Sequence, residues 1–95
     1  MLSMNERRIK RFERIFKGVA NHWRIRILLV IKASPDIILE QIVEELKSNY
    51  QTTAEHVRRL NIAGLITKKY HGRAVEHKLS PYGIQMLKIM EDFKE

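Results

Sequence analysis

The chain has 95 residues, enough for one domain with a single core, and its 44% hydrophobic and 31% charged residues are typical of a globular protein. No apolar run is long enough to cross a bilayer, and the first residues lead into charge instead of a signal-peptide core, so we expect one cytoplasmic domain over residues 1–95 without a membrane partner. The net charge is +7 and there is no cysteine, which excludes disulfides, thiolate metal sites and thiol nucleophiles.

Residues 5–18 are predicted to form an amphipathic helix that ends near Gly18. Its apolar residues recur at spacings of three and four and therefore share one stripe, which comprises Ile9, Phe12, Phe16 and Val19. A second helix is expected over residues 22–33, because the side chain of Asn21 can accept a hydrogen bond from an unpaired N–H of its first turn. The core-facing residues of this second helix are predicted to be Ile27, Leu28 and Ile31.

A turn at residues 34–36 is followed by Ile37 and Ile38, which are compatible with a very short strand. The third helix has apolar residues at positions i, i+3, i+4 and i+7, namely Leu39, Ile42, Val43 and Leu46. The fourth helix is expected over residues 50–62, with Thr53, Val57 and Leu60 pointing inward. Its cap is either Asn49 or Thr52, the latter with Glu55 as its capping-box partner.

Two strands, residues 65–70 and 74–79, are predicted to form a hairpin in which Gly72 supplies the positive φ of a tight turn. Alternation in the second strand places Val75, His77 and Leu79 on one side. The hairpin tip is expected to be basic through Lys68, Lys69, Arg73 and Lys78. Ser80 is predicted to cap a last helix over residues 81–94, whose apolar stripe comprises Ile84, Leu87, Met90 and Phe93.

Positive charge is concentrated in two parts of the chain. Residues 1–26 carry eight Lys or Arg against two acidic residues, and residues 51–80 carry six against two. Clustered positive charge attracts a polyanion, because neutralising phosphates releases condensed counterions. Nucleic acid is therefore the expected partner, against the alternative that the basic surface only keeps the protein in solution.

The outward face of the fourth helix carries side chains that suit DNA bases. Gln51 suits adenine, Arg58 suits guanine, and Glu55 can accept a hydrogen bond from cytosine unless its role is structural. Contacts to the DNA backbone are expected from Tyr50, Thr52, Arg59, Lys68, Lys69, Arg73 and Lys78. The alternatives are a solvated surface for the charged residues and a packing role for Tyr50. Arg24 and Arg26 either contact the backbone or brace the fold through ion pairs with Glu40, Glu44 or Glu45.

Two stretches match the pattern of a known family. Residues 21–28, Asn-His-Trp-Arg-Ile-Arg-Ile-Leu, follow an Asn-Pro-Thr-Arg-hydrophobic-Arg-Ile-Leu motif apart from His22 and Trp23, and residues 63–80 contain Ala-Gly-Leu, a basic strand, a Gly-Arg tip and a closing Leu-Ser. The chain thus resembles the ArsR-type winged-helix transcriptional repressors over about residues 12–90. The resemblance implies that the fourth helix reads double-stranded DNA, that the hairpin, or wing, holds its backbone, and that the first and last helices form a dimer.

The residues and the resemblance together predict a mainly α fold with a small β-hairpin, a winged helix-turn-helix. Its expected order is helix, helix, short strand, helix, helix, strand, strand, helix. A symmetric homodimer would bury the apolar stripes of the two terminal helices, with contacts from Ile9, Phe12, Phe16, Leu87, Met90 and Phe93. It would place two reading helices about one DNA turn, roughly 34 Å, apart on a palindromic operator. The alternative is that both stripes only complete the monomer core.

Metal and enzyme functions find little support in the sequence. The four histidines, at positions 22, 56, 71 and 77, lack the spacing of ligands on one element, and the third and last helices lack the cysteine or histidine with which this family binds metal. We expect no metal or other cofactor, and we expect His77 to be a packed residue of the wing.

Without a Gly-rich phosphate loop or a nucleophile with a placed base, we expect no enzyme. The alternative functions are nonspecific, architectural DNA binding and docking of a protein or RNA, and the sequence names no effector.

Overall fold

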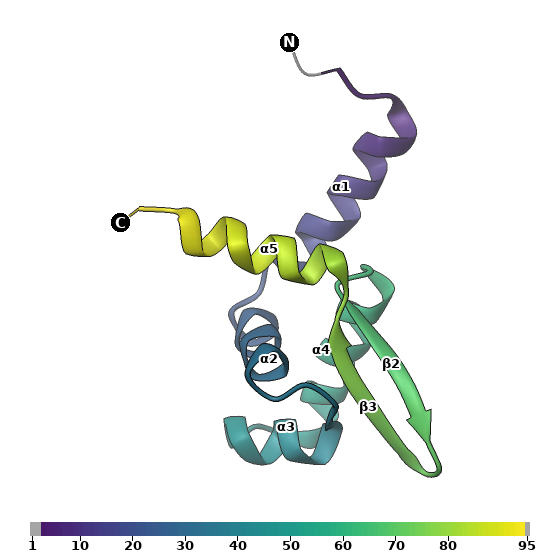
Figure 1. The fold of residues 1–95 in the computed structure, drawn as a ribbon, viewed down its shortest axis with the longest axis vertical. Helices are drawn as coiled ribbons and strands as arrows, with labels where there is room; N and C mark the ends of the chain where they lie inside the picture. Colours follow the sequence, from purple (N-terminus) through teal and green to yellow (C-terminus); the bar gives the residue numbers. More distant parts are fainter. Residues whose placement is uncertain (1–2, 95) are drawn as a thin grey trace.

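The computed structural model describes residues 3–94, and its elements follow the predicted order (Figure 1). Helices α1 (Glu6–Val19) and α2 (His22–Ala33) precede the two-residue strand β1 (Ile37–Ile38) and the helices α3 (Leu39–Leu46) and α4 (Tyr50–Ile62). Strands β2 (Ile66–His71) and β3 (Ala74–Leu79) form the hairpin, and α5 (Pro81–Asp92) follows it. The predicted fold class, mainly α with a small β-hairpin, is confirmed.

Asparagine and serine side chains cap four of the helices, namely Asn5, Asn21, Asn49 and Ser80. Of the two candidates for the cap of α4, Asn49 is the one used, because its Oδ1 accepts a hydrogen bond from the backbone N–H of Thr52 at 2.9 Å. Thr52 therefore lies inside the helix. Glu55 is not the capping-box residue of α4 and is available for other partners.

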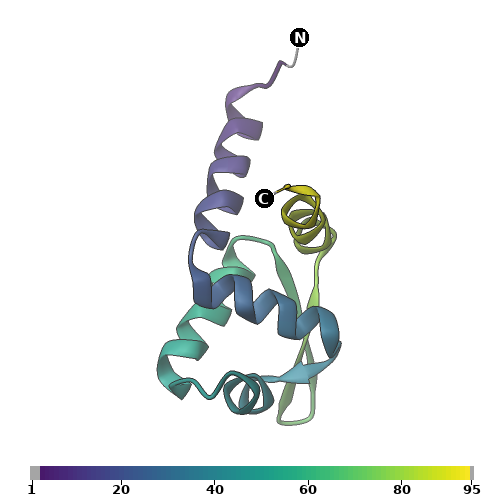
Figure 2. The same cartoon turned by 90° about the vertical axis from the view of Figure 1, so that its left-hand side faces the viewer.

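Helix α2 lies at the centre of the molecule and packs against α3, α4, α5 and β3 (Figure 2). The largest fully buried side chains come from this helix and its neighbours: Ile27, Leu28, Ile31, Ile42, Leu60 and Leu65. The core residues predicted for α2 are thus confirmed. Because α3 and α4 are fixed against this core, the outward face of α4 is held in a constant orientation relative to the hairpin.

The three strands form one antiparallel sheet in the order β1, β3, β2, with Ile37 opposite His77 and Ile66 opposite Leu79. His77 is a packed residue of the wing, as predicted, since it is 2% exposed and its Nδ1–H donates to the carbonyl of Ile37 at 2.9 Å. Gly72 has φ +64° and occupies the first position of the two-residue turn, where a positive φ is required.

Helix α1 lies within one residue of its predicted bounds, and its apolar residues are divided between the core and solvent. It continues through Gly18 to Val19, and its buried residues are Ile15, Gly18 and Val19, whereas Ile9 and Phe16 of the predicted stripe are exposed. A Cβ on Gly18 would overlap the Cβ of Ala63 at the end of α4, so a residue without a side chain is needed at this crossing. The N-terminal part of α1 projects beyond the core (Figure 1). Of the four residues of the apolar stripe, Ile9 and Phe16 are exposed in the monomer, whereas Phe12 and Val19 pack against the core.

Candidate nucleic-acid interface

The inward face of α4 is anchored in the core and its outward face is open to solvent. Thr53, Val57 and Leu60 are buried, as predicted. The hydroxyl of Thr53 donates to the carbonyl of Asn49 at 2.6 Å and lies 2.6 Å from Ser48 Oγ, which ties the first turn of α4 to the link after α3. The exposed residues of the outward face are Gln51, Thr52, Glu55, Arg58 and Arg59.

Glu55 is hydrogen-bonded to both arginines of this face. Its Oε2 accepts from Nε of Arg58 at 3.0 Å, and its Oε1 accepts from Nη2 of Arg58 at 2.9 Å and from Nε of Arg59 at 3.0 Å. The hydrogen bonds from Arg58 and then from Arg59, with their positive charges, lower the pKa of Glu55 to about 2. Glu55 and Arg58, both predicted to touch bases, are therefore also partners of each other.

The wing divides its basic residues between its two sides. Lys68 lies directly opposite the buried His77 and points to the side that faces α4, whereas Lys69 lies opposite Glu76 on the other side. Arg73 is exposed at the turn. Of the cations predicted for the tip, Arg73 lies at the turn itself, whereas Lys68 and Lys69 lie farther along the hairpin on its two opposite sides, so they do not form one patch.

Lys78 corrects the prediction of a four-residue basic tip. It lies opposite Thr67 near the base of the hairpin, and its Nζ is 3.5 Å from Oδ1 of Asp36. The prediction followed closeness in sequence, but in an antiparallel hairpin the residues farthest from the turn are also farthest from the tip. Lys78 is therefore paired with Asp36 away from the tip, and its predicted contact with the DNA backbone stays a prediction.

A groove of about 350 Å³ separates α4 from the inner side of the wing. Its walls bring together Arg58 of α4 with Lys68 and Arg73 of the wing, and its lining includes Tyr50 and Tyr70. Tyr50 is 50% exposed, so about half of its surface is covered by its neighbours. Three cations from two separate elements and the carboxylate of Glu40 thus line one concave surface. Its net charge is positive, which suits the sugar-phosphate backbone next to a helix in the major groove.

Arg24 and Arg26 do not form the predicted ion pairs with acidic residues of α3. Nη1 of Arg24 donates to the carbonyls of Lys17 and Gly18 at 3.2 and 3.1 Å, and Nε donates to Nδ1 of His56 at 3.2 Å. Arg24 therefore braces the fold by joining the end of α1 to α4. Arg26 lies over the ring of Trp23 at 5.6 Å.

His56 is a structural residue of α4 that the sequence patterns did not single out. It is half-buried, and its burial together with the neighbouring Arg24 lowers the pKa of its imidazole. A neutral imidazole is needed for Nδ1 to accept the hydrogen bond from Arg24. Its partner lies 32 positions away in the chain, so no local spacing could have revealed it.

A second surface, on α1 and α5, carries most of the residues predicted to form a dimer. Ile9, Phe16 and Phe93 are 44%, 52% and 73% exposed, and Phe12 and Met90 are half-buried. Leu87 must be removed from this set, because it is only 5% exposed and packs in the monomer core. Apolar residues cover more of α5 than one contact surface needs. Their spacing of three and four residues therefore did not show which of them are buried in the monomer and which are exposed.

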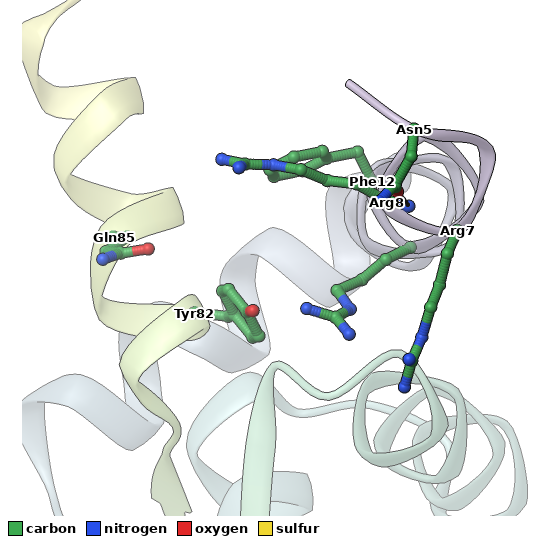
Figure 3. Close-up of a pocket in the computed structure, with 7 residues that line it drawn as sticks. Asn5, Arg7, Arg8, Phe12, Tyr82 and Gln85 are labelled. Atoms are coloured by element: carbon green, nitrogen blue, oxygen red, sulfur yellow. Dashed lines mark hydrogen bonds between the residues drawn. The ribbon is translucent and has the colours of Figure 1, made fainter. Parts of the chain in front are cut away.

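The notch between these helices is basic on one side. A cavity of about 560 Å³ is lined by Arg7, Arg8 and Arg11 of α1, and Tyr82 and Gln85 face them from α5 (Figure 3). Arg8 extends toward α5 across the ring of Phe12, with its guanidinium carbon 5.4 Å from the ring centre. In residues 3–94 none of these three arginines has an acidic side chain within 4.0 Å.

Two further observations concern residues 3–94 as a whole. No three His, Asp or Glu side chains in this part of the chain come together as possible ligands of a metal ion. None of the helices described there has the length and apolar character that crossing a membrane requires.

Several solved structures share this architecture. The homodimeric winged helix-turn-helix DNA-binding domain of a possible ArsR-family transcriptional regulator from Mycobacterium bovis superimposes with a TM-score of 0.77, at 18% identity over 97% of this chain and 91% of that one. HlyU from Vibrio cholerae gives 0.79 at 18% identity over 92% and 95% of the two chains. The transcriptional repressor PagR of Bacillus anthracis gives 0.82 at 15% identity over 90% and 99%.

The chain therefore has the winged helix-turn-helix fold. No protein-family model matches the sequence, and no curated protein matches it either. At identities below one fifth, the likeness to the solved structures establishes the fold and leaves the function to be argued from the site.

Proposed function

We propose that this protein is a sequence-specific, double-stranded DNA-binding transcriptional regulator of the ArsR type that acts as a homodimeric repressor. The observation that carries the proposal is the open polar face of α4, held rigidly beside a groove whose walls combine cations of α4 and the wing. The major groove of B-DNA admits a helix, and a hairpin beside that helix can reach the adjoining backbone. The names of the structures with this fold, which are transcriptional regulators and a repressor, support the same conclusion.

Within this proposal the exposed residues of α4 divide by chemistry. Gln51 reads adenine and Arg58 reads guanine, while Glu55 lies beside Arg58 on the same face. Contacts to phosphate and sugar come from the residues around them: Tyr50, Thr52, Arg59, Lys68, Lys69 and Arg73. These contacts set the position of α4 on the duplex and supply most of the salt-dependent affinity.

The homodimer is proposed to form through α1 and α5. Exposed aromatic side chains, among them Phe16 on α1 and Phe93 directly after α5, would be buried by a second copy. A two-fold axis at this surface gives two copies of α4 and therefore a palindromic operator. No effector is part of the proposal.

Selection from a pool of random duplexes, performed with the full chain at two salt concentrations, tests the proposed function. We expect enrichment of a palindrome whose half-sites are centred about 10 base pairs, or one DNA turn, apart. We also expect affinity for every duplex to fall as salt increases.

The other outcomes favour other functions. A pool that stays random while binding remains strong would indicate architectural binding, and the absence of duplex binding would indicate a protein or RNA partner. An enriched single half-site without symmetry would leave the DNA-reading role intact and contradict the dimeric arrangement.

A further inference from the structure

The ion pair between Glu55 and Arg58 uses only one edge of the guanidinium group. Glu55 accepts from Nε and Nη2 of Arg58, at 3.0 and 2.9 Å, which is the side-on, two-bond arrangement of a carboxylate and an arginine. The opposite edge, formed by Nη1 and the second N–H of Nη2, has no hydrogen-bond partner within residues 3–94. The pair therefore leaves two parallel N–H groups directed away from Glu55.

Two parallel N–H donors match one DNA base in particular. Guanine presents two adjacent acceptors, O6 and N7, in the major groove, and a bidentate arginine is its usual partner. An arginine whose side-on edge is already occupied can approach guanine only with the end-on edge. Glu55 thus reduces the orientations that Arg58 can take and leaves the one that suits guanine.

We propose that Glu55 is a positioning residue, which holds Arg58 in the orientation that reads guanine and so determines specificity. This inference rests on the proposed function, since it names how the outward face of α4 discriminates between bases. Glu55 need not touch the DNA itself.

The same carboxylate restrains the other arginine of the helix. Oε1 of Glu55 also accepts from Nε of Arg59 at 3.0 Å, so a single acid engages both cations of α4. A phosphate close to either arginine also lies near this acid, so the carboxylate offsets part of the attraction that each arginine exerts on the phosphate. The pKa of Glu55 is lowered to about 2, so the carboxylate stays ionised throughout the neutral range. Binding to arbitrary sequences is therefore weakened while guanine can still be read.

The substitution Glu55→Gln tests the inference in the full 95-residue chain. It is measured on the duplex enriched by wild-type protein, on duplexes in which each selected guanine is replaced, and on a random duplex. For wild type we expect discrimination of about tenfold at one guanine, the range of a bidentate pair, and a similar loss when 7-deazaguanine removes the N7 acceptor. For Glu55→Gln we expect that discrimination to fall below about threefold while affinity for the random duplex increases.

Glu13→Gln is the matched control. Glu13 on α1 also joins two cations of its own helix, with Oε1 3.9 Å from Lys10 Nζ and Oε2 3.5 Å from Lys17 Nζ, so its substitution removes the same charge from the same kind of pair. We expect Glu13→Gln to retain wild-type discrimination at guanine. Thermal unfolding of both variants shows whether they remain folded.

The combination with Arg58→Ala separates positioning from direct reading. In the absence of Arg58, Glu55→Gln should change no base preference, because its effect is exerted through that arginine. A change of preference at cytosine in the Arg58→Ala background would overturn the inference and assign Glu55 a direct base contact.

The remaining outcomes distinguish this inference from the proposed function. If wild type selects a guanine-containing site and Glu55→Gln discriminates as well as wild type does, the positioning role is wrong and the DNA-reading function stands. If wild type selects no sequence at all, the base-reading function fails, and the positioning role fails with it.

Discussion

Gly18 shows how a single hydrogen atom in place of a side chain determines where α1 lies. A Cβ at this position would overlap the Cβ of Ala63 at the end of α4, and Gly18 is buried inside a regular helix. Both backbones are parts of the packed core, so neither helix can move without disturbing its own contacts. The close contact between Gly18 and Ala63 therefore fixes the end of α1 beside the end of α4.

We expect Gly18→Ala to lower the free energy of unfolding by about 1–3 kcal/mol, the usual effect of overpacking a core. Urea unfolding at one pH measures the change. Ala63→Gly removes the opposing Cβ, so the double variant Gly18→Ala/Ala63→Gly should be more stable than the sum of the two single changes predicts. Additive effects would show that the two Cβ positions do not compete for the same space.

His77 should make the stability of the fold depend on pH. Desolvation of the buried ring lowers the pKa of His77 below its usual 6.5 in the folded protein. As the pH falls below about 6.5, the unfolded chain binds a proton that the folded chain does not, so the free energy of unfolding decreases. The stabilisation from the neutral ring is fully present above that pH and is lost on acidification.

Urea unfolding between about pH 7.5 and about pH 5.5 checks this expectation through the slope of stability against pH. The slope should be smaller in His77→Gln, which has no imidazole to protonate. His56, whose pKa is lowered by burial and by Arg24, should account for part of the remaining slope, so His56→Gln/His77→Gln should be flatter still. A slope unchanged in His77→Gln would contradict the role given to the buried ring.

At the scale of elements, α4 and the wing are expected to contribute different terms to DNA binding. The side chains of α4 lie on one open face of an anchored helix, whereas Lys69 and Arg73 lie at exposed positions of a two-stranded hairpin. A base edge is recognised by direction, and a phosphate is recognised mainly by charge. The rigid element therefore suits reading, and the hairpin suits backbone contact.

We expect Lys69→Ala and Arg73→Ala to weaken binding to all duplexes by a similar factor and to lower the salt slope by about 0.9 for each phosphate that the protein no longer neutralises. Gln51→Ala should instead remove preference at one position and leave the salt slope nearly unchanged. Lys32→Ala, an exposed lysine of α2 outside the proposed interface, is the charge control and should retain wild-type affinity. If a wing variant changes which bases are preferred, the wing reads sequence as well.

The elements could be predicted because their cues act within a few residues. Asn21 and Ser80 cap the helices that follow them, and Gly72 makes the turn of the hairpin, each through geometry that the neighbouring sequence already contains. The contacts of Arg24 and the inner face of α1 could not be predicted in the same way. The contacts of Arg24 depend on which helices cross in the folded chain. The buried face of α1 is ambiguous in the sequence, because an apolar stripe at helical spacing can include Ile15 as well as Phe16.

The candidate interface was predictable in part for the same reason. Periodicity placed Gln51 and Arg58 on one face of a helix, and the structure has them there. Periodicity does not tell whether a carboxylate on that face is free, and it did not show that Glu55 is engaged by two arginines. It also grouped Lys78 with the tip, although Lys78 lies opposite Thr67 near the base of the hairpin.

At the scale of the molecule, α1 and α5 leave an apolar surface that the monomer does not cover. Ile9 and Phe16 on α1, Ile89 on α5 and Phe93 directly after α5 are all at least 44% exposed. Large apolar patches on soluble proteins are commonly covered by another molecule. In the proposed dimer a second copy covers them.

We expect Phe93→Ser to weaken self-association by about 1–2 kcal/mol, roughly tenfold, since buried aromatic anchors dominate interfaces. Sedimentation over a range of concentrations measures the change. Tyr70→Ser is the matched control, because Tyr70 is also 73% exposed and lies on the wing, away from α1 and α5. Equal effects of the two substitutions, or a wild-type protein that is monomeric at every concentration, would contradict this surface as the interface.

Arg24 has a mechanical consequence for the whole protein. Its one guanidinium holds the last carbonyls of α1 and the imidazole of His56 in α4 at the same time. A change in the tilt of α1 must therefore either break these hydrogen bonds or move α4 with it. In a homodimer that forms through α1, the distance between the two copies of α4 would therefore depend on the angle at which the two subunits meet.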